Sequence, residues 1–107
     1  MAGMSVFRSK RFKAWYKALR DKEKRIVDVR VTLVRELGLL NKYKELDRKL
    51  SLYEFKWGSG MRVYFSLLKD EEGGFMLLLT GGNKNSQSAD ITASKNLIIK
   101  AVKGIKK

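Results

Sequence analysis

The chain of 107 residues contains no cysteine, no histidine and no proline. Without cysteine it can form neither disulfides nor a thiolate metal site. Without histidine it lacks the usual acid–base side chain and the commonest metal ligand. These absences exclude a zinc hydrolase and a Ser-His-Asp enzyme, so any catalysis must depend on Lys, Arg, Tyr or carboxylate groups. We therefore expect neither a metal ion nor another cofactor.

Long apolar segments are also missing. No stretch approaches the roughly 18 apolar residues of a membrane-spanning helix, and the beginning of the sequence lacks the apolar run of a signal peptide. Hydrophobic residues still make up 44% of the chain, which is enough for one core. The sequence predicts a single cytoplasmic domain over residues 1–107 that does not span a membrane.

Positive charge is present in large excess. Lys and Arg total 24 against 11 Asp and Glu, which gives a net charge of +13 at pH 7. On one compact domain, such a charge favours a polyanionic partner, such as nucleic acid, an acidic protein or a membrane surface. The alternative is a basic soluble protein without such a partner.

Apolar residues at helical spacing predict two helices near the N-terminus. The first, over about 10–19, has an apolar face made of Phe12, Trp15, Tyr16 and Leu19. The second is predicted over about 22–37, with Asp21 as its N-cap and Gly38 just beyond its end. Because the break between them is short, they are expected to form an antiparallel hairpin.

Alternating apolar residues predict the strands. A short strand opens the chain, and a loop is expected over 39–49. Strands then follow over 50–57, 61–67 and 75–80, separated by turns at 58–60 and 69–74. Ser88 is the expected N-cap of a final helix of about 15 residues. The order β-α-α-β-β-β-α predicts an α+β fold, in which an antiparallel sheet carries an N-terminal helical hairpin and a C-terminal helix.

The first candidate site lies on the hairpin over 50–67. Lys56 and Arg62 are expected to face each other across its turn, with Tyr64 one step further along the same face. Opposed like charges reduce stability, so a sheet that retains them is suited to binding an anion such as phosphate. The alternative is an ordinary solvated strand face.

Two further segments are candidate phosphate contacts. The loop over 80–87 follows a buried strand, and its glycines would let backbone N–H groups approach a phosphate, with Asn83 and Gln87 as predicted RNA contacts. It does not match a Walker A loop or a dinucleotide fingerprint, and the glycines can equally serve a plain turn.

The other segment is the outer face of the first helix, with Lys10, Arg11, Lys13, Lys17 and Arg20. This face could contact nucleic acid or an acidic partner helix, or it could simply be solvated. The acidic run over 70–72 is expected at a hairpin tip and lacks the further ligands of a metal site.

The order of these motifs resembles the RelE/ParE superfamily of type II toxin–antitoxin toxins, and most closely its HigB-like addiction module killer branch. Residues 12–15 and 19–21 resemble the family's opening helix and the turn that follows it. Residues 54–56 and 58–65 resemble its E-L-R strand and its G-P-G-Y-R-V-Y-F hairpin. Residues 77–87 resemble L-L-x-G-G-D-K-S-S-Q, and residues 90–93 the start of its last helix. In this chain Ser59 stands in place of the usual Pro, Met61 in place of Tyr and Asn83 in place of Asp.

The resemblance implies a twisted antiparallel sheet with helices on one face and a basic concave surface on the other. It also implies a ribosome-dependent mRNA endoribonuclease that uses no metal, in which the 2′-hydroxyl attacks the neighbouring phosphate. In this interpretation Arg62 stabilises the transition state, Lys56 or Lys84 acts as base or second cation, and Tyr64 orients the phosphate or donates a proton. The alternative is a DNA gyrase inhibitor of the ParE type without a catalytic site. The endoribonuclease would bind mRNA and the ribosome, whereas the inhibitor would bind gyrase. Both would have a cognate antitoxin, encoded by an adjacent gene, as their partner.

Overall fold

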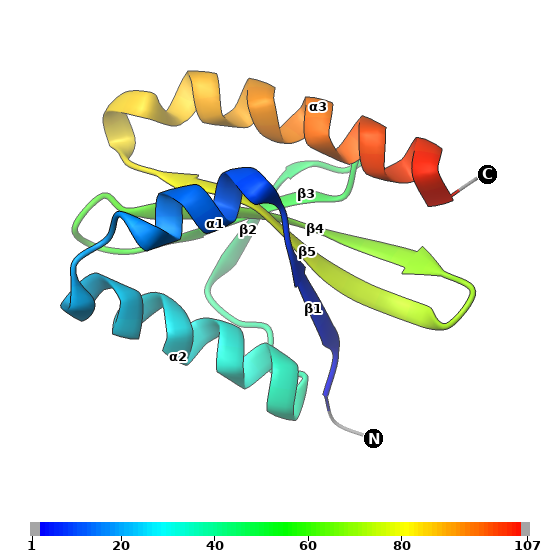
Figure 1. The fold of residues 1–107 in the computed structure, drawn as a ribbon, viewed down its shortest axis with the longest axis horizontal. Coiled ribbons are helices and arrows are strands. Elements are labelled where there is room, and N and C mark those ends of the chain that lie inside the picture. Colours follow the sequence, from blue (N-terminus) through cyan, green and yellow to red (C-terminus); the bar gives the residue numbers. More distant parts are fainter. Residues whose placement is uncertain (1–2, 106–107) are drawn as a thin grey trace.

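The computed structural model describes residues 3–105, and Figure 1 shows the order of the elements along the chain. They are β1 (Ser5–Arg8), α1 (Lys10–Lys17), α2 (Asp21–Leu37), β2 (Tyr43–Asp47), β3 (Leu52–Lys56), β4 (Arg62–Asp70), β5 (Gly73–Gly82), a 3₁₀ turn (Lys84–Ser86) and α3 (Gln87–Ile105). The α+β class predicted from the sequence is confirmed.

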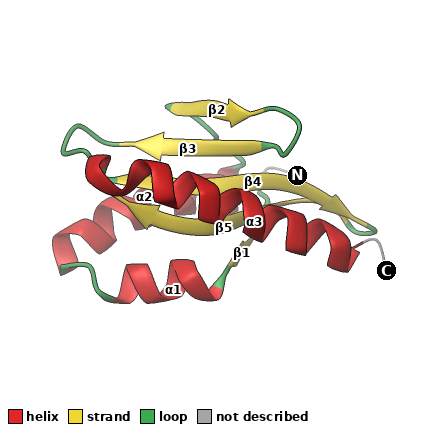
Figure 2. Ribbon diagram, turned by 90° about the horizontal axis from the view of Figure 1, so that it is seen from above, coloured by secondary structure: helices red, strands yellow, loops and turns green. Residues whose placement is uncertain are grey.

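One five-stranded sheet, in the order β1-β5-β4-β3-β2, organises the molecule. All neighbouring strands are antiparallel except β1, which pairs in parallel with β5. Helices α2 and α3 lie on opposite faces of this sheet (Figure 2). Helix α1 packs against β5. The structure therefore has three layers, with the sheet in the middle.

This layering corrects an expectation drawn from the family resemblance, namely that the helices cover one face and leave a basic face open. Helix α3 packs its residues Ile98, Ile91 and Val102 on the second face, against Leu52, Tyr64 and Leu79 of the sheet. Helix α2 buries Val27, Val31 and Val34 on the first face with the aromatic rings of β3 and β4. Each helix has an apolar stripe that must be removed from water, so both faces are used.

Strand β2 was not predicted, because the segment over 39–49 shows no clear period. In the structure, Tyr43–Asp47 pairs with β3 as an exposed edge strand, with a bulge between Glu45 and Asp47. An edge strand contacts only one neighbour and keeps charged side chains in water, so its sequence carries no buried alternation.

The helix ends follow the sequence only in part. Gly38 ends α2 in the left-handed conformation (φ 66°), as predicted. The prediction of Asp21 as N-cap is wrong: the capping position is Arg20, whose N–H donates to the Glu23 carboxylate (3.1 Å). Ser88 lies inside α3, and Asn83 caps the 3₁₀ turn that leads into that helix.

The predicted helical hairpin is present. Tyr16 of α1 donates its hydroxyl proton to the Asp28 carboxylate of α2 (2.7 Å), and Lys24 lies over the same ring. Among the described residues, no helix is long and apolar enough to cross a membrane.

Helix α1 approaches the sheet closely at Gly81, which generates a test of the fold. A Cβ atom at Gly81 would lie 2.3 Å from the Trp15 ring, so Gly81→Ala must displace a half-buried indole. We expect a loss of about 1–3 kcal/mol in the free energy of unfolding, measured by urea denaturation. Gly58→Ala is the matched control, because a Cβ there meets nothing within 4 Å. Equal stability of the two variants would contradict the packing of α1 on β5.

Candidate nucleic-acid interface

The two basic residues of the hairpin face each other, as the sequence predicts. Lys56 of β3 pairs with Arg62 of β4, and Arg62 pairs in turn with Gly82 of β5. Lys84 follows two residues later. The three predicted cations Lys56, Arg62 and Lys84 therefore lie at the same end of the sheet, on successive strands or directly beyond them.

Arg62 is not a free cation, which corrects the expectation of an open pleated surface that grips phosphate. Its side chain is 7% exposed, and its Nε lies 3.4 Å from Oε1 of Glu54, which is 3% exposed. One of its terminal nitrogens donates to the Gly60 carbonyl (3.2 Å). A guanidinium can be buried only with a counter-charge, and Glu54 supplies it. The pairing also removes the repulsion between Lys56 and Arg62 expected from the sequence.

Tyr64 is buried as well, directly across β3–β4 from Glu54. Its hydroxyl has no hydrogen-bond partner among the residues that the structure describes. Burial, followed by the negative charges of Glu54 and Asp90, raises the pKa of Tyr64 to about 12, although Arg62 acts in the opposite direction. The phenol is therefore neutral at physiological pH: it can donate a proton or a hydrogen bond, and it does not serve as a base.

A polar network that the sequence analysis missed fixes the start of α3 over these residues. Asp90 is 5% exposed and accepts the Ser86 hydroxyl proton (2.6 Å). Arg11 of α1 reaches the same carboxylate (3.6 Å) and donates from Nε to Thr80 (3.2 Å). Arg11, predicted as an RNA contact, thus ties α1 to β5 and α3.

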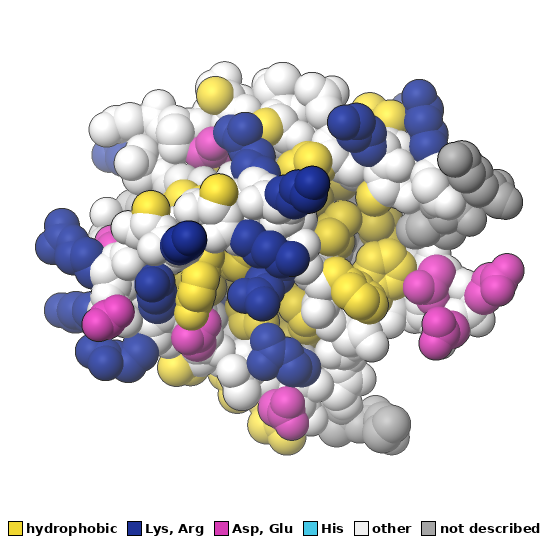
Figure 3. All heavy atoms as spheres, viewed as in Figure 1, with side chains coloured by type: hydrophobic (Ala, Val, Ile, Leu, Met, Phe, Trp, Pro, Cys, Tyr) yellow, Lys and Arg dark blue, Asp and Glu magenta, His cyan; other side chains and the backbone are white. Residues whose placement is uncertain are grey.

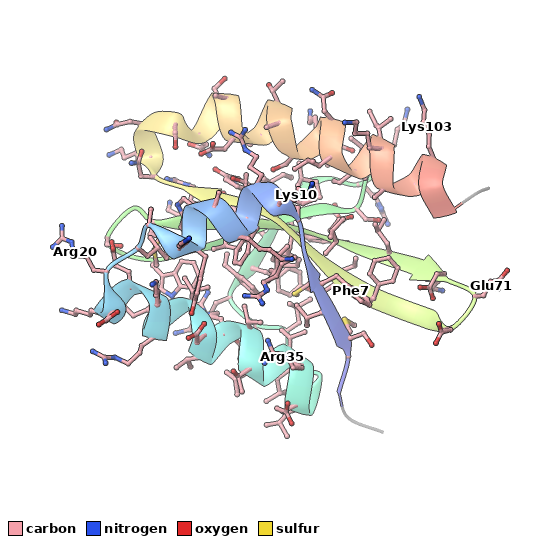
Figure 4. The ribbon with its side chains drawn as sticks, viewed as in Figure 1. Phe7, Lys10, Arg20, Arg35, Glu71 and Lys103 are labelled. Atoms are coloured by element: carbon pink, nitrogen blue, oxygen red, sulfur yellow. The ribbon has the colours of Figure 1, made fainter. Side chains whose placement is uncertain are left out.

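The accessible cations lie around this buried network. Lys56 and Lys84 are both exposed, and the Lys84 Cβ would lie 3.8 Å from a Cβ on Gly60, in the β3–β4 turn. Along α1 and its C-terminal end, the exposed predicted contacts are Lys10, Lys13, Lys17 and Arg20. Figure 3 shows Lys and Arg side chains gathered over α1 and the adjoining end of the molecule, and Figure 4 shows Lys10 and Arg20 near the two ends of this surface.

The loop over 80–87 uses its polar groups internally. The Asn83 side-chain oxygen accepts the N–H groups of Asn85 (2.8 Å) and Ser86 (3.1 Å), and the Asn83 N–H donates to the Ser86 hydroxyl (3.1 Å). The sequence predicts that backbone N–H groups of this loop approach a phosphate, but those of Asn83, Asn85 and Ser86 are bonded within the loop instead. Asn83 itself is exposed, whereas Gln87 is half-buried at the start of α3.

A hollow of about 380 Å³ lies where this loop meets the β3–β4 turn and the α1–α2 junction. Its wall combines apolar and polar side chains, which are Trp15, Leu19, Glu23, Ser59, Met61, Asn83 and Ser86 together with the backbone of Gly81 and Gly82.

The acidic residues Asp70, Glu71 and Glu72 lie exposed at the β4–β5 turn, at the other end of β4. The described residues contain no group of three acidic side chains that could hold a metal ion.

Comparison with known proteins identifies the fold. No protein-family profile and no curated protein matches the sequence. Among solved structures, the chain is similar to an arginine-to-alanine double mutant of the E. coli toxin RelE in the free state, with a TM-score of 0.66, 14% identity, and coverage of 89% of this chain and 95% of that one. It is also similar to the Mycobacterium tuberculosis toxin–antitoxin complex RelBE2, with a TM-score of 0.56, 19% identity, and coverage of 76% and 98%. The chain has the fold of a RelE toxin.

Proposed function

We propose that this protein is the toxin of a type II toxin–antitoxin system and that it cleaves mRNA on the ribosome without a metal ion. The observation that carries the proposal is the position of Lys56 and Lys84. Both are exposed at the same end of a RelE-like sheet. The whole chain also carries a net charge of +13. Such a surface attracts the phosphate backbone of RNA.

The proposed reaction is an internal transfer at one RNA phosphate. The 2′-hydroxyl loses its proton to a base and its oxygen bonds to the adjacent phosphorus, while the bond to the 5′-oxygen of the next nucleotide breaks. The products are a 2′,3′-cyclic phosphate and a 5′-hydroxyl that takes up a proton. The reaction needs a base, a cation at the phosphate and a proton donor. Lys56 and Lys84 are the proposed base and cation.

Arg62 and Tyr64 enter this proposal in a different way from that expected from the sequence. Arg62 holds β3 and β4 together through Glu54, so we assign it the positioning of Lys56, its own register partner on β3. Tyr64 carries a neutral hydroxyl with no partner in the described part of the chain. To act as a proton donor, this buried hydroxyl must be reached by the RNA from the β3–β4 turn.

Inhibition of DNA gyrase is the second candidate function. The observation that favours it is the burial of Arg62 and Tyr64, because an inhibitor needs a binding surface and no reacting groups. The RelE-like fold is compatible with both functions. Both share an expected partner, an antitoxin with an acidic or amphipathic segment that covers part of the basic surface.

The two functions differ in the outcome of induction. We expect primer extension on a cellular transcript to show cuts within translated codons after the wild-type protein is induced. Lys84→Ala and Lys56→Ala should each reduce cleavage about 10²–10³-fold, as for the loss of a group that stabilises transition-state charge. Lys103→Ala, an exposed lysine of α3, is the control and should cleave normally. DNA breaks with an SOS response and intact mRNA would instead establish the gyrase function.

The Arg62–Glu54 pair predicts a particular pattern of stability. Arg62→Met or Glu54→Leu alone leaves one charge buried without its partner, so each should lower the free energy of unfolding by about 3–5 kcal/mol. The double variant removes both charges and should recover most of this loss. Urea denaturation of the four proteins measures the coupling, and additive losses would contradict the pairing.

Tyr64 predicts a dependence of stability on alkaline pH. Its pKa is about 12 in the folded state and near 10 in the unfolded chain, so the unfolded state loses this proton first. The stabilisation is complete below pH 10 and is lost as the pH rises from 10 to about 12. Tyr64→Phe should flatten the stability profile in that window. At pH 7 it should cost little, because the hydroxyl has no partner to lose.

A further inference from the structure

Helix α2 carries an apolar stripe on a side that the rest of the described chain leaves exposed. Val29 is 61% exposed, Leu37 52% and Ile26 36%, and Leu33 is half-buried between them. At 3.6 residues per turn, these four side chains lie within about 80° of one another around the helix axis. Single exposed apolar residues are common on protein surfaces, whereas a continuous apolar stripe is typical of an interaction site.

This stripe is distinct from the face that α2 packs on the sheet. The packed face consists of the buried residues Val27, Val31 and Val34. Its centre lies about 120° around the helix from the centre of the stripe. Helix α1 does not cover the stripe either, because Tyr16 meets Asp28 of α2 (2.7 Å) on the far side of the packed face. Figure 3 shows hydrophobic side chains at the lower edge of the molecule, over α2.

Charge identifies the kind of partner that fits this side of the molecule. Within α2, five basic and four acidic residues leave a net charge of +1, in a chain whose total is +13. A nucleic acid or an acidic peptide would therefore be drawn to the lysine-rich surfaces outside α2. Two copies of this chain, in contrast, can approach each other through α2, because charges more than about 8 Å away are largely screened at physiological ionic strength.

Two charged residues define how a second copy fits. Arg25 and Glu36 are exposed, and they lie on the same flank of the stripe, about 20° apart around the helix axis. When two identical helices pack antiparallel about a two-fold axis, each flank meets the same flank of the other copy in reverse. Arg25 then faces Glu36 of the second copy, and the reverse pair forms by symmetry. The same register sets the apolar stripe of one copy on that of the other.

We infer that α2 joins two copies of this protein into an antiparallel, two-fold symmetric dimer, and this inference does not depend on the proposed function. In the dimer, Ile26 of one copy packs against Leu37 of the other, and Val29 packs near the two-fold axis. Helix α2 has 17 residues and is therefore about 25 Å long. Two such helices bury an area near the low end of specific interfaces, about 1,200 Å² in total. We therefore expect a reversible dimer with a Kd of about 10–100 µM.

Charge reversal tests the antiparallel register. Arg25→Glu and Glu36→Arg each place like charges opposite one another across the interface, so each should weaken the dimer about tenfold. The double variant restores opposite charges and should dimerise as the wild type does. Lys100→Glu, at an exposed lysine of α3, is the control, because it changes the net charge by the same amount as Arg25→Glu and leaves α2 intact.

Removal of an apolar side chain tests the stripe itself. Val29→Ser removes the most exposed of its side chains and should weaken the dimer about tenfold. Ile99→Ser changes a residue of α3 that is 42% exposed, and this control should dimerise normally. Circular dichroism melting curves of the full-length chains establish that each variant is folded.

Sedimentation equilibrium of the nuclease-treated proteins, from about 1 to 500 µM, measures the dissociation constant. We expect added NaCl to strengthen the dimer, because salt screens the repulsion between two copies of charge +13. A wild type that stays monomeric over this range would overturn the inference, and so would a dimer that Val29→Ser leaves unchanged. If the double charge variant does not recover, the antiparallel register is wrong. If the wild type is monomeric and the protein encoded by the adjacent reading frame binds Val29→Ser more weakly, that protein occupies the stripe and the dimer is excluded.

Discussion

A permanent guanidinium charge cannot be left alone inside a protein, and this constraint underlies the arrangement of the whole α3 face. Glu54 and Arg62 lie on adjacent strands and neutralise one another, so the surface around them can be covered by a helix. Helix α3 then buries Leu52, Tyr64 and Leu79 on the same face. If either partner were missing, the helix would enclose an isolated charge, which is far costlier than leaving the face open to water.

The same arrangement determines where anion-binding groups can be. The residues that most resemble a family active site in sequence, Arg62 and Tyr64, form part of the interior. Lys56 and Lys84 remain at the border between the covered face and solvent. Arg11 and Asp90 join α1, β5 and α3 at this border, so the exposed lysines are carried by a rigid frame and not by isolated loops.

The sequence predicts those parts of the fold that depend on local periodicity. The hairpin of β3 and β4, the pairing of Lys56 with Arg62, the buried strand β5 and the end of α2 at Gly38 all follow from alternation, spacing or a left-handed glycine. Strand β2 could not be predicted, because an exposed edge leaves no apolar pattern. The burial of Arg62 could not be predicted either, since it depends on which face α3 covers and on the distance to a carboxylate. Both are properties of the tertiary structure, and the amphipathic pattern of a helix does not specify them.

Charge is distributed unevenly along β4. Its first residue, Arg62, lies beside Lys56, and its last, Asp70, begins the acidic turn completed by Glu71 and Glu72. The two ends of this strand are about 27 Å apart at ordinary strand rise, so the charge along it changes sign over that distance. A polyanion would exert a torque on such a molecule before contact, turning the lysine-bearing end toward the anion and the acidic turn away. The acidic turn at the opposite end of the sheet thus contributes to the orientation of the first encounter.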